Sequence, residues 1–154
     1  MEVKFVKVHD DAVLPAQNNK ESVIIDGVLA PTSDSGYDIT AVGDMLIPAK
    51  GAAVVPVGFK VGYITPGYWF KIEARSGLSF KHGILPHPGI VDCMYRGALG
   101  VRLYNHSTDD YHVSKGDKIA QFVVYPIIEA ETGWIDEAVE TTRGEKGFGS
   151  SDKK

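Results

Sequence analysis

The sequence has almost no cysteine and no long apolar segment, and these two absences exclude whole classes of protein. Cys93 is the one cysteine among 154 residues, so no disulfide can form within the chain. No apolar run approaches the ~20 residues of a membrane-spanning helix, and the N-terminus has no signal-peptide pattern. We expect a soluble intracellular protein without a membrane partner, cytoplasmic in the simplest case, with a nuclear location or a viral origin left open.

The chain also lacks a strong excess of charge of either sign. Its 16 Lys and Arg residues stand against 20 Asp and Glu residues, which gives a formal net charge of −4 at pH 7. No basic stripe is interleaved with aromatic residues, so the pattern does not favour binding of duplex nucleic acid. Any phosphate chemistry must depend on a few individually placed cations.

Leucine is scarce and β-branched residues are abundant, which favours strands over helices. There are 7 Leu residues against 29 Val and Ile residues. Turns rich in Gly and Pro separate short apolar runs, as in β-sandwiches and closed barrels, and only residues 76–82 have a helical pattern. The predicted strands cover residues 3–8, 23–28, 53–61, 69–74, 98–104 and 119–125.

The C-terminal part differs from the rest, so we expect one domain with two sections: a β core over residues 1–126, and an arm with a glycine-rich lid over residues 127–154. Residues 143–151 contain three glycines, one aromatic ring and no core pattern, which predicts a flexible tail. Residues 127–142, if extended at roughly 3.3 Å each, span on the order of 50 Å, which exceeds the width of such a domain. The tail can therefore reach a neighbouring subunit.

One candidate anion site follows the predicted strand that ends at residue 74. Arg75, Ser76 and Gly77 offer a planar guanidinium, a hydroxyl and backbone N–H groups at the start of the predicted helix. These are groups that phosphate oxygens accept hydrogen bonds from. The same residues also fit a plain alternative, in which a serine caps the helix beside a surface arginine.

A second candidate lies between Gly89 and Gly97, where apolar residues surround Asp92 and Tyr95 follows three positions later. We interpret this segment as a hairpin that lines a pocket. Glycine lets the backbone approach a planar base closely, and Asp92 can then serve as a general base. An ordinary aspartate in a turn is the alternative.

Two further segments are weaker on their own. Gln121 lies near the start of a predicted strand that follows the turn at residues 116–117. In the tail, Arg143, Ser150 and glycine N–H groups suit oxyanions, and Phe148 suits stacking on a planar ring. Plain disorder is the alternative for a glycine-rich tail.

Taken in order, these segments resemble the five sequence motifs of the homotrimeric dUTP pyrophosphatase (dUTPase) family. The resemblance covers about residues 20 to 151, and five motifs in this order are far more specific than any one alone. Ser35 and Lys146 depart from the family pattern, which usually has alanine and glycine there. The first motif corresponds to Ala30 and Pro31 together with residues 35–39, and the other four correspond to residues 75–78, 89–97, 116–121 and 143–151.

The resemblance implies a fold, a reaction and an assembly. The fold is a distorted jelly-roll β-barrel or sandwich, and the assembly is a homotrimer with three active sites shared between subunits. The reaction is hydrolysis of dUTP to dUMP and pyrophosphate, which limits uracil in DNA and supplies dUMP for thymidylate synthesis. Mg²⁺ is held through the triphosphate and water, with no direct protein ligand.

The resemblance also implies roles for individual residues. Asp92 corresponds to the carboxylate that activates the attacking water, and Asp38 is a carboxylate that frames the site. Tyr95 packs under the sugar, and the backbone of Gly89, Ile90 and Val91 reads uracil. The residues implied to contact the triphosphate or close over the nucleotide are Arg75, Ser76, Gly77, Gln121, Arg143, Phe148, Gly149 and Ser150.

Two other functions remain open at this point. A dCTP deaminase has the same fold, but it uses a glutamate ten residues after the motif-three aspartate, and here that position is Arg102. A non-catalytic trimeric jelly-roll binding protein is the other alternative. An inactive homologue should have lost Asp92 or Arg75, and both are present.

Overall fold

Alternating apolar and polar side chains along the long strands determine the architecture of the protein. The computed structural model describes residues 1–145, which form thirteen strands and one short helix. Along β7 (Ala52–Ile64), Val55 and Val57 are buried whereas Val54 is exposed. Because successive side chains on a strand point to opposite faces, this alternation gives the strand one core face and one surface face.

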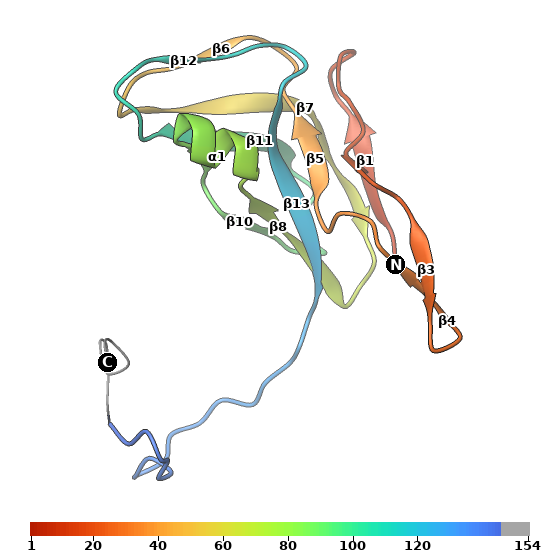
Figure 1. Cartoon of the computed structure of the whole chain (residues 1–154), viewed down its shortest axis with the longest axis vertical. Helices are drawn as coiled ribbons and strands as arrows, with labels where there is room; N and C mark the ends of the chain where they lie inside the picture. Colours follow the sequence, from red (N-terminus) through yellow and green to blue (C-terminus); the bar gives the residue numbers. More distant parts are fainter. Residues whose placement is uncertain (146–154) are drawn as a thin grey trace.

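The strands form two main antiparallel sheets that enclose the core in a jelly-roll-like sandwich (Figure 1). The first sheet has the order β1 (Val3–Lys7), β7, β11 (Ala98–Asn105) and β9 (Ile84–Pro86). The second has the order β10 (Gly89–Val91), β8 (Tyr68–Glu73), β13 (Lys118–Pro126), β5 (Tyr37–Thr40) and β2 (Ala16–Gln17). Two smaller pairs join β12 (Tyr111–Val113) to β6 (Met45–Ile47), and β3 (Ser22–Ile25) to β4 (Val28–Pro31).

A cluster of phenylalanine rings joins the two sheets at the centre of the core. Phe5 and Phe59 come from the first sheet, and their ring centroids lie 4.8 Å apart. Phe70 and Phe122 come from the second sheet, with centroids 4.7 Å apart. Phe5 also contacts Phe122 at 5.8 Å between centroids. Such pairs contribute about 0.5–1.5 kcal/mol beyond the burial of their area, so the cluster fixes how the sheets face each other.

Gly58 interrupts the alternation of β7 and brings Phe59 into the core. Its φ is +74°, and a Cβ at this position would lie 2.7 Å from Val42 Cγ1. Its carbonyl accepts a hydrogen bond from the Val8 N–H at 2.9 Å. Glycine takes this conformation without steric cost, so the irregularity depends on the absence of a side chain.

The structure confirms the predicted all-β class and the one short helix, α1, which covers Ser76–His82 as predicted. No helix within residues 1–145 is long and apolar enough to cross a membrane. The single strand predicted over residues 23–28 is wrong, because Asp26 and Gly27, both with positive φ, form a turn between β3 and β4. Branched apolar residues on both sides obscured this turn, although an Asp-Gly pair is a strong hairpin signal.

The hairpin predicted between Gly89 and Gly97 is also wrong. β10 pairs with β8 in the second sheet, whereas β11 pairs with β7 and β9 in the first. The segment between β10 and β11 therefore crosses from one sheet to the other. The prediction missed the shortest strands, including β2, β6, β9, β10 and β12, because two or three residues are too few to show a period.

The chain leaves the sandwich at the end of β13. From residue 127 to 145 it forms no strand or helix, and Figure 1 shows this arm extending away from the sheets. Every residue of the arm is exposed, including Ile128, Trp134 and Val139. Large apolar side chains that stay in water on an extended segment are typical of a surface that another chain covers.

Asn105 at the end of β11 provides a test of how the fold is held together. Its side-chain amide is buried and donates to the carbonyls of Ile47 at 3.0 Å and Asp109 at 2.8 Å. We expect Asn105→Ala to lower the free energy of unfolding by about 2–4 kcal/mol, because it removes both of these buried hydrogen bonds and the packing of the side chain. Urea unfolding measures this loss, with the exposed neighbour His106→Ala as control. Equal stability of the two variants would contradict the role of Asn105.

Candidate functional site

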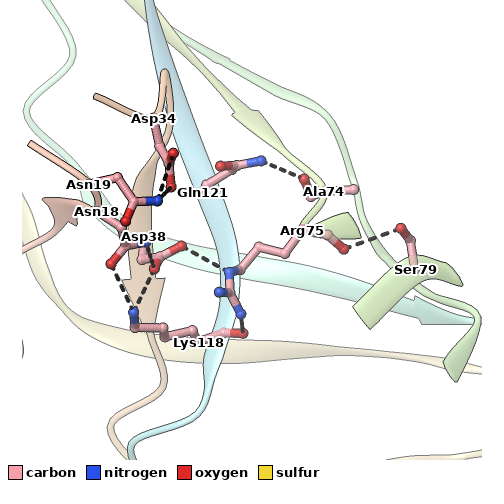
Figure 2. A network of polar contacts seen from close by, with 9 residues as sticks. All are labelled: Asn18, Asn19, Asp34, Asp38, Ala74, Arg75, Ser79, Lys118 and Gln121. Atoms are coloured by element: carbon pink, nitrogen blue, oxygen red, sulfur yellow. Dashed lines mark hydrogen bonds and ion pairs between the residues drawn. The ribbon is translucent and has the colours of Figure 1, made fainter. Parts of the chain in front are cut away.

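The strand register of the second sheet brings three predicted site residues together. Gln121 on β13 lies opposite Asp38 on β5 and opposite Glu73 on β8. Arg75 follows the same end of β8, directly before α1. Figure 2 shows that Asp38, Arg75 and Gln121 come together there from three different elements.

Asp38 is the buried carboxylate of this site. It accepts hydrogen bonds from Arg75 Nε at 2.8 Å and Asn18 Nδ2 at 2.9 Å, and Lys118 Nζ lies 2.7 Å away (Figure 2). Burial by itself would raise the pKa of Asp38. The hydrogen bonds from Lys118 and Asn18 and the charges of Arg75 and Lys118 outweigh burial and hold the pKa below its ordinary value.

Arg75 is fixed at two points and keeps donors for a ligand. Its Nε donates to Asp38, and its Nη1 donates to the Lys118 carbonyl at 3.1 Å. A guanidinium has five N–H groups, so three have no hydrogen-bond partner within residues 1–145. The guanidinium is thus held in one direction, unlike that of a loose surface arginine beside a helix cap. Ser76 is the first helical residue, and Arg75 stands at the N-cap position.

Two polar cavities adjoin Arg75. One, of about 190 Å³, is lined by Asn18, Asp34, Gly36, Asp38, Arg75, Ser76, Gly77 and Gln121. The other, of about 450 Å³, includes the cationic side chains of Lys81 and Lys118 in its lining. Four residues that the sequence predicts at the triphosphate therefore line one cavity: Arg75, Ser76, Gly77 and Gln121.

Gln121 is held in this cavity by packing and by one hydrogen bond. Its Nε2 donates to the Ala74 carbonyl at 2.8 Å. Gly36 faces it so closely that a Cβ at this position would collide with the Gln121 side-chain amide. The absence of a side chain at Gly36, in the first motif, thus leaves the space that the Gln121 side chain of the fourth motif occupies.

Asp92 and Tyr95 lie in the exposed turn after β10. The Tyr95 hydroxyl donates to the Ala98 carbonyl at 2.8 Å, which fixes the ring against the start of β11. A Cβ at Gly97 would collide with that ring, so the ring requires the glycine. The turn thus holds an oriented aromatic ring beside a solvent-exposed carboxylate.

One chain does not bring this turn to the Arg75 cavity. Val91 lies opposite Phe70, so Asp92 lies beyond it, toward the first residue of β8, whereas Arg75 follows the last. The six residue steps from Trp69 to Arg75 span about 20 Å when extended. Arg143 lies on the exposed arm, and Phe148, Gly149 and Ser150 lie outside the described residues.

Comparison with known proteins identifies the family. The family model described as dUTPase matches residues 24–152. The chain belongs to the dUTPase family. It is 36% identical to the deoxyuridine 5'-triphosphate nucleotidohydrolase of Oryza sativa subsp. japonica, over 97% of this chain and 80% of that protein. It is 40% identical to the enzyme of that name from Eremothecium gossypii, over 94% of each.

A solved structure is similar over nearly the whole chain. The dUTPase of Staphylococcus bacteriophage 80alpha, solved with dUpNHpp, is 27% identical and has a TM-score of 0.77. The comparison covers 97% of this chain and 98% of that one. The similarity therefore includes the arm as well as the jelly-roll-like core of this dUTPase-family chain.

The sequence interpretation missed Asn18, Asp34 and Lys118. Lys118 lies within the fourth motif but was not assigned a role, although a cation beside the turn was visible. Asn18 and Asp34 belong to no motif, and only the fold brings them beside Asp38. Such residues cannot be predicted from local sequence patterns, because these patterns do not show which remote polar side chains come together when the strands pair.

The lowered pKa of Asp38 makes a prediction about acid stability. The folded carboxylate holds its charge below the ordinary value of 3.8, so its contribution to folding is complete above about pH 5 and is lost as pH falls through the folded pKa. We expect Asp38→Asn to be about 1–2 kcal/mol less stable than the parent at pH 7, with the difference shrinking toward pH 3. Urea unfolding at both pH values measures this, with Asp10→Asn as control. A difference independent of pH would contradict it.

Proposed function

We propose that this protein hydrolyses dUTP to dUMP and pyrophosphate, and so limits uracil in DNA while supplying dUMP for thymidylate synthesis. The observation that carries the proposal is the cavity in which Asp38 orients Arg75 beside Ser76, Gly77 and Gln121. A guanidinium, a hydroxyl and an amide there suit the oxygens of a triphosphate. Membership of the dUTPase family supports the same substrate.

In this proposal Asp92 acts as general base. Its carboxylate accepts a proton from a water molecule while the water oxygen forms a bond to the α-phosphorus. The bond from the α-phosphorus to the oxygen bridging to the β-phosphate breaks, and pyrophosphate leaves with that electron pair. Positioning and proton removal by one carboxylate are typically worth about 10²–10⁴ in rate.

The uracil and sugar subsites lie along β10 and the turn after it. β10 is an edge strand, so one side of its backbone at Gly89, Ile90 and Val91 is not paired to a strand within residues 1–145. Backbone N–H and C=O groups on that side can read the edge of uracil. The Tyr95 ring, fixed by the Ala98 carbonyl, packs under the deoxyribose where a 2′-hydroxyl would collide.

Mg²⁺ enters the proposal as part of the substrate. No three His, Cys, Asp or Glu side chains within residues 1–145 form a group that could hold a metal ion. Asp38, the buried carboxylate of the cavity, is already paired with two cations. Triphosphate oxygens and water suit Mg²⁺, which keeps much of its hydration shell, and the side chains around Arg75 bind the resulting complex.

We further propose a homotrimer in which each active site is shared between chains. Asp92 and Arg75 lie beyond opposite ends of β8 in one chain, and this arrangement supports a site that a second chain completes. Residues 1–126 form the core of the single domain, and residues 127–154 form an arm and lid that reach a neighbour. In that lid Arg143, Gly149 and Ser150 contact the phosphates, and Phe148 stacks on uracil.

We propose an intracellular location, in the simplest case the cytoplasm, because the proposed substrate is found there. The substrate is a nucleotide of the intracellular pool, and the single thiol, Cys93, is free. A free thiol without any structural disulfide fits a reducing compartment.

A nucleotide assay tests the reaction directly. The protein is incubated with Mg²⁺ and dUTP, dCTP, UTP or dTTP, and pyrophosphate and ammonia are measured. We expect pyrophosphate from dUTP alone. Ammonia from dCTP would instead identify a deaminase, and no product from any nucleotide would favour a binding protein.

The same assay tests Asp92. We expect Asp92→Asn to bind dUTP but to lose about 10²-fold or more in turnover, because an amide of the same size cannot accept the proton. Asp109→Asn, a change at another exposed aspartate, is the control. Turnover near that of the parent would remove Asp92 as the base.

Mixed trimers test whether sites are shared. Asp92→Asn chains and chains truncated before Arg143 are each expected to be almost inactive as homotrimers. After co-refolding, some sites should combine an intact Asp92 from one chain with an intact tail from another, so activity should exceed that of either chain refolded alone. If mixing never exceeds those two residual activities, each site is completed within one chain.

A further inference from the structure

Asn18 lies at the centre of the polar network around Asp38, although no motif contains it. Its Nδ2 donates to Asp38 Oδ2 at 2.9 Å, and its Oδ1 lies 3.4 Å from Lys118 Nζ (Figure 2). Lys118 in turn contacts the same oxygen of Asp38 at 2.7 Å. One side-chain amide therefore meets both the carboxylate and the cation that balances it.

The backbone around Asn18 is fixed by the base of the β3–β4 hairpin. The Asn18 carbonyl accepts a hydrogen bond from the Asp34 N–H at 3.2 Å, and Gln17 Nε2 donates to the Asp34 carbonyl at 2.9 Å. Asn19 Nδ2 donates to the Asp34 carboxylate at 3.2 Å. The chain leaves the sheet after β2. The backbone bond from Asp34 to Asn18 and the bond from Gln17 close this excursion and fix where the Asn18 amide lies, whereas the Asn19 bond joins two exposed side chains.

The two carboxylate oxygens of Asp38 have different partners. Oδ1 accepts from Arg75 Nε, and Oδ2 accepts from Asn18 and faces Lys118. The Lys118 side chain is 46% exposed, and a long, partly exposed ammonium group constrains the direction of a carboxylate weakly. The planar Asn18 amide, on a backbone bonded to Asp34, adds a directional hydrogen bond at the same oxygen.

We infer that Asn18 is a positioning residue for the triphosphate: it orients the Asp38 carboxylate, which in turn orients the Arg75 guanidinium toward the cavity. The inference rests on the proposed function, in which Arg75 binds triphosphate oxygens. Arg75 has three N–H groups left for those oxygens, and their direction depends on the bond from Nε to Asp38. Holding a binding group in its productive direction before the ligand arrives lowers the entropic cost of binding.

Orientation of Arg75 by Asn18 and Asp38 should affect binding of the triphosphate and not binding of the nucleoside. In the proposed function the Arg75 cavity binds the phosphates, whereas the uracil and sugar subsites are assigned to β10 and the turn after it, and β8 and β13 lie between β10 and the strand β5 that carries Asp38. Loss of the Asn18 amide should therefore weaken binding of a triphosphate and leave binding of the nucleoside part unchanged. A general loss of folding would weaken both.

The test compares Asn18→Ala with Asn19→Gly in the full-length protein. Both side chains are exposed amides of one segment, but Asn19 contacts Asp34 and not Asp38. Glycine is chosen at position 19 because the φ of Asn19 is 50°, which glycine adopts without strain. We expect Asn18→Ala to raise the KM for dUTP about 3- to 10-fold with kcat within about 2-fold of the parent. The inhibition constant of dUMP should not change, and Asn19→Gly should behave as the parent.

A second variant excludes a trivial loss of packing. Asn18→Asp keeps the size of the side chain but replaces the donor facing Asp38 with a carboxylate oxygen, so it should raise the KM more than Asn18→Ala. Thermal unfolding shows whether each variant is folded. Unchanged KM in both variants, or equal effects on dUTP and dUMP, would overturn the positioning role. A parent protein that hydrolyses no dUTP would instead overturn the proposed function.

Discussion

The buried carboxylate of Asp38 is the interaction on which the candidate site depends. It joins β5 to Arg75, two residues after β8, to the first residue of β13 and to the segment after β2. A charge removed from water is costly unless it is paired and hydrogen-bonded, and here two cations and one amide meet it. The same contacts that make its burial acceptable also hold Arg75 in a fixed direction.

The second sheet separates the two halves of the chemistry within one chain. Its edge strand β10 ends near the start of β8, while Arg75 follows the end of β8. Within residues 1–145 this antiparallel register keeps the two sets of residues at opposite ends of β8. The exposed apolar side chains of the arm, among them Trp134 and Ile128, give the chain a surface that association can bury. The division of the site and the extended arm therefore support the same assembly.

The sequence by itself determined the fold class, the helix and the positions of the main groups of the site. Scarce leucine, many β-branched residues and frequent turns are local properties, and they sufficed for the long strands and for α1. The five motifs identified the family that the comparisons confirmed. The shortest strands and the crossing after β10 were beyond local patterns, because each depends on which partner strand lies nearby.

Only the tertiary structure decided how the site is built. Asn18 and Asp34 belong to no motif. Asn18 follows β2, whose pairing with β5 brings it beside Asp38, and Asp34 bonds to the Asn18 backbone. Gly36 proved to make room for Gln121, a relation between residues 85 positions apart. Sequence motifs record which groups a reaction needs. Hydrogen bonds between segments remote in sequence decide which way those groups point, and those bonds exist only once the sheets have formed.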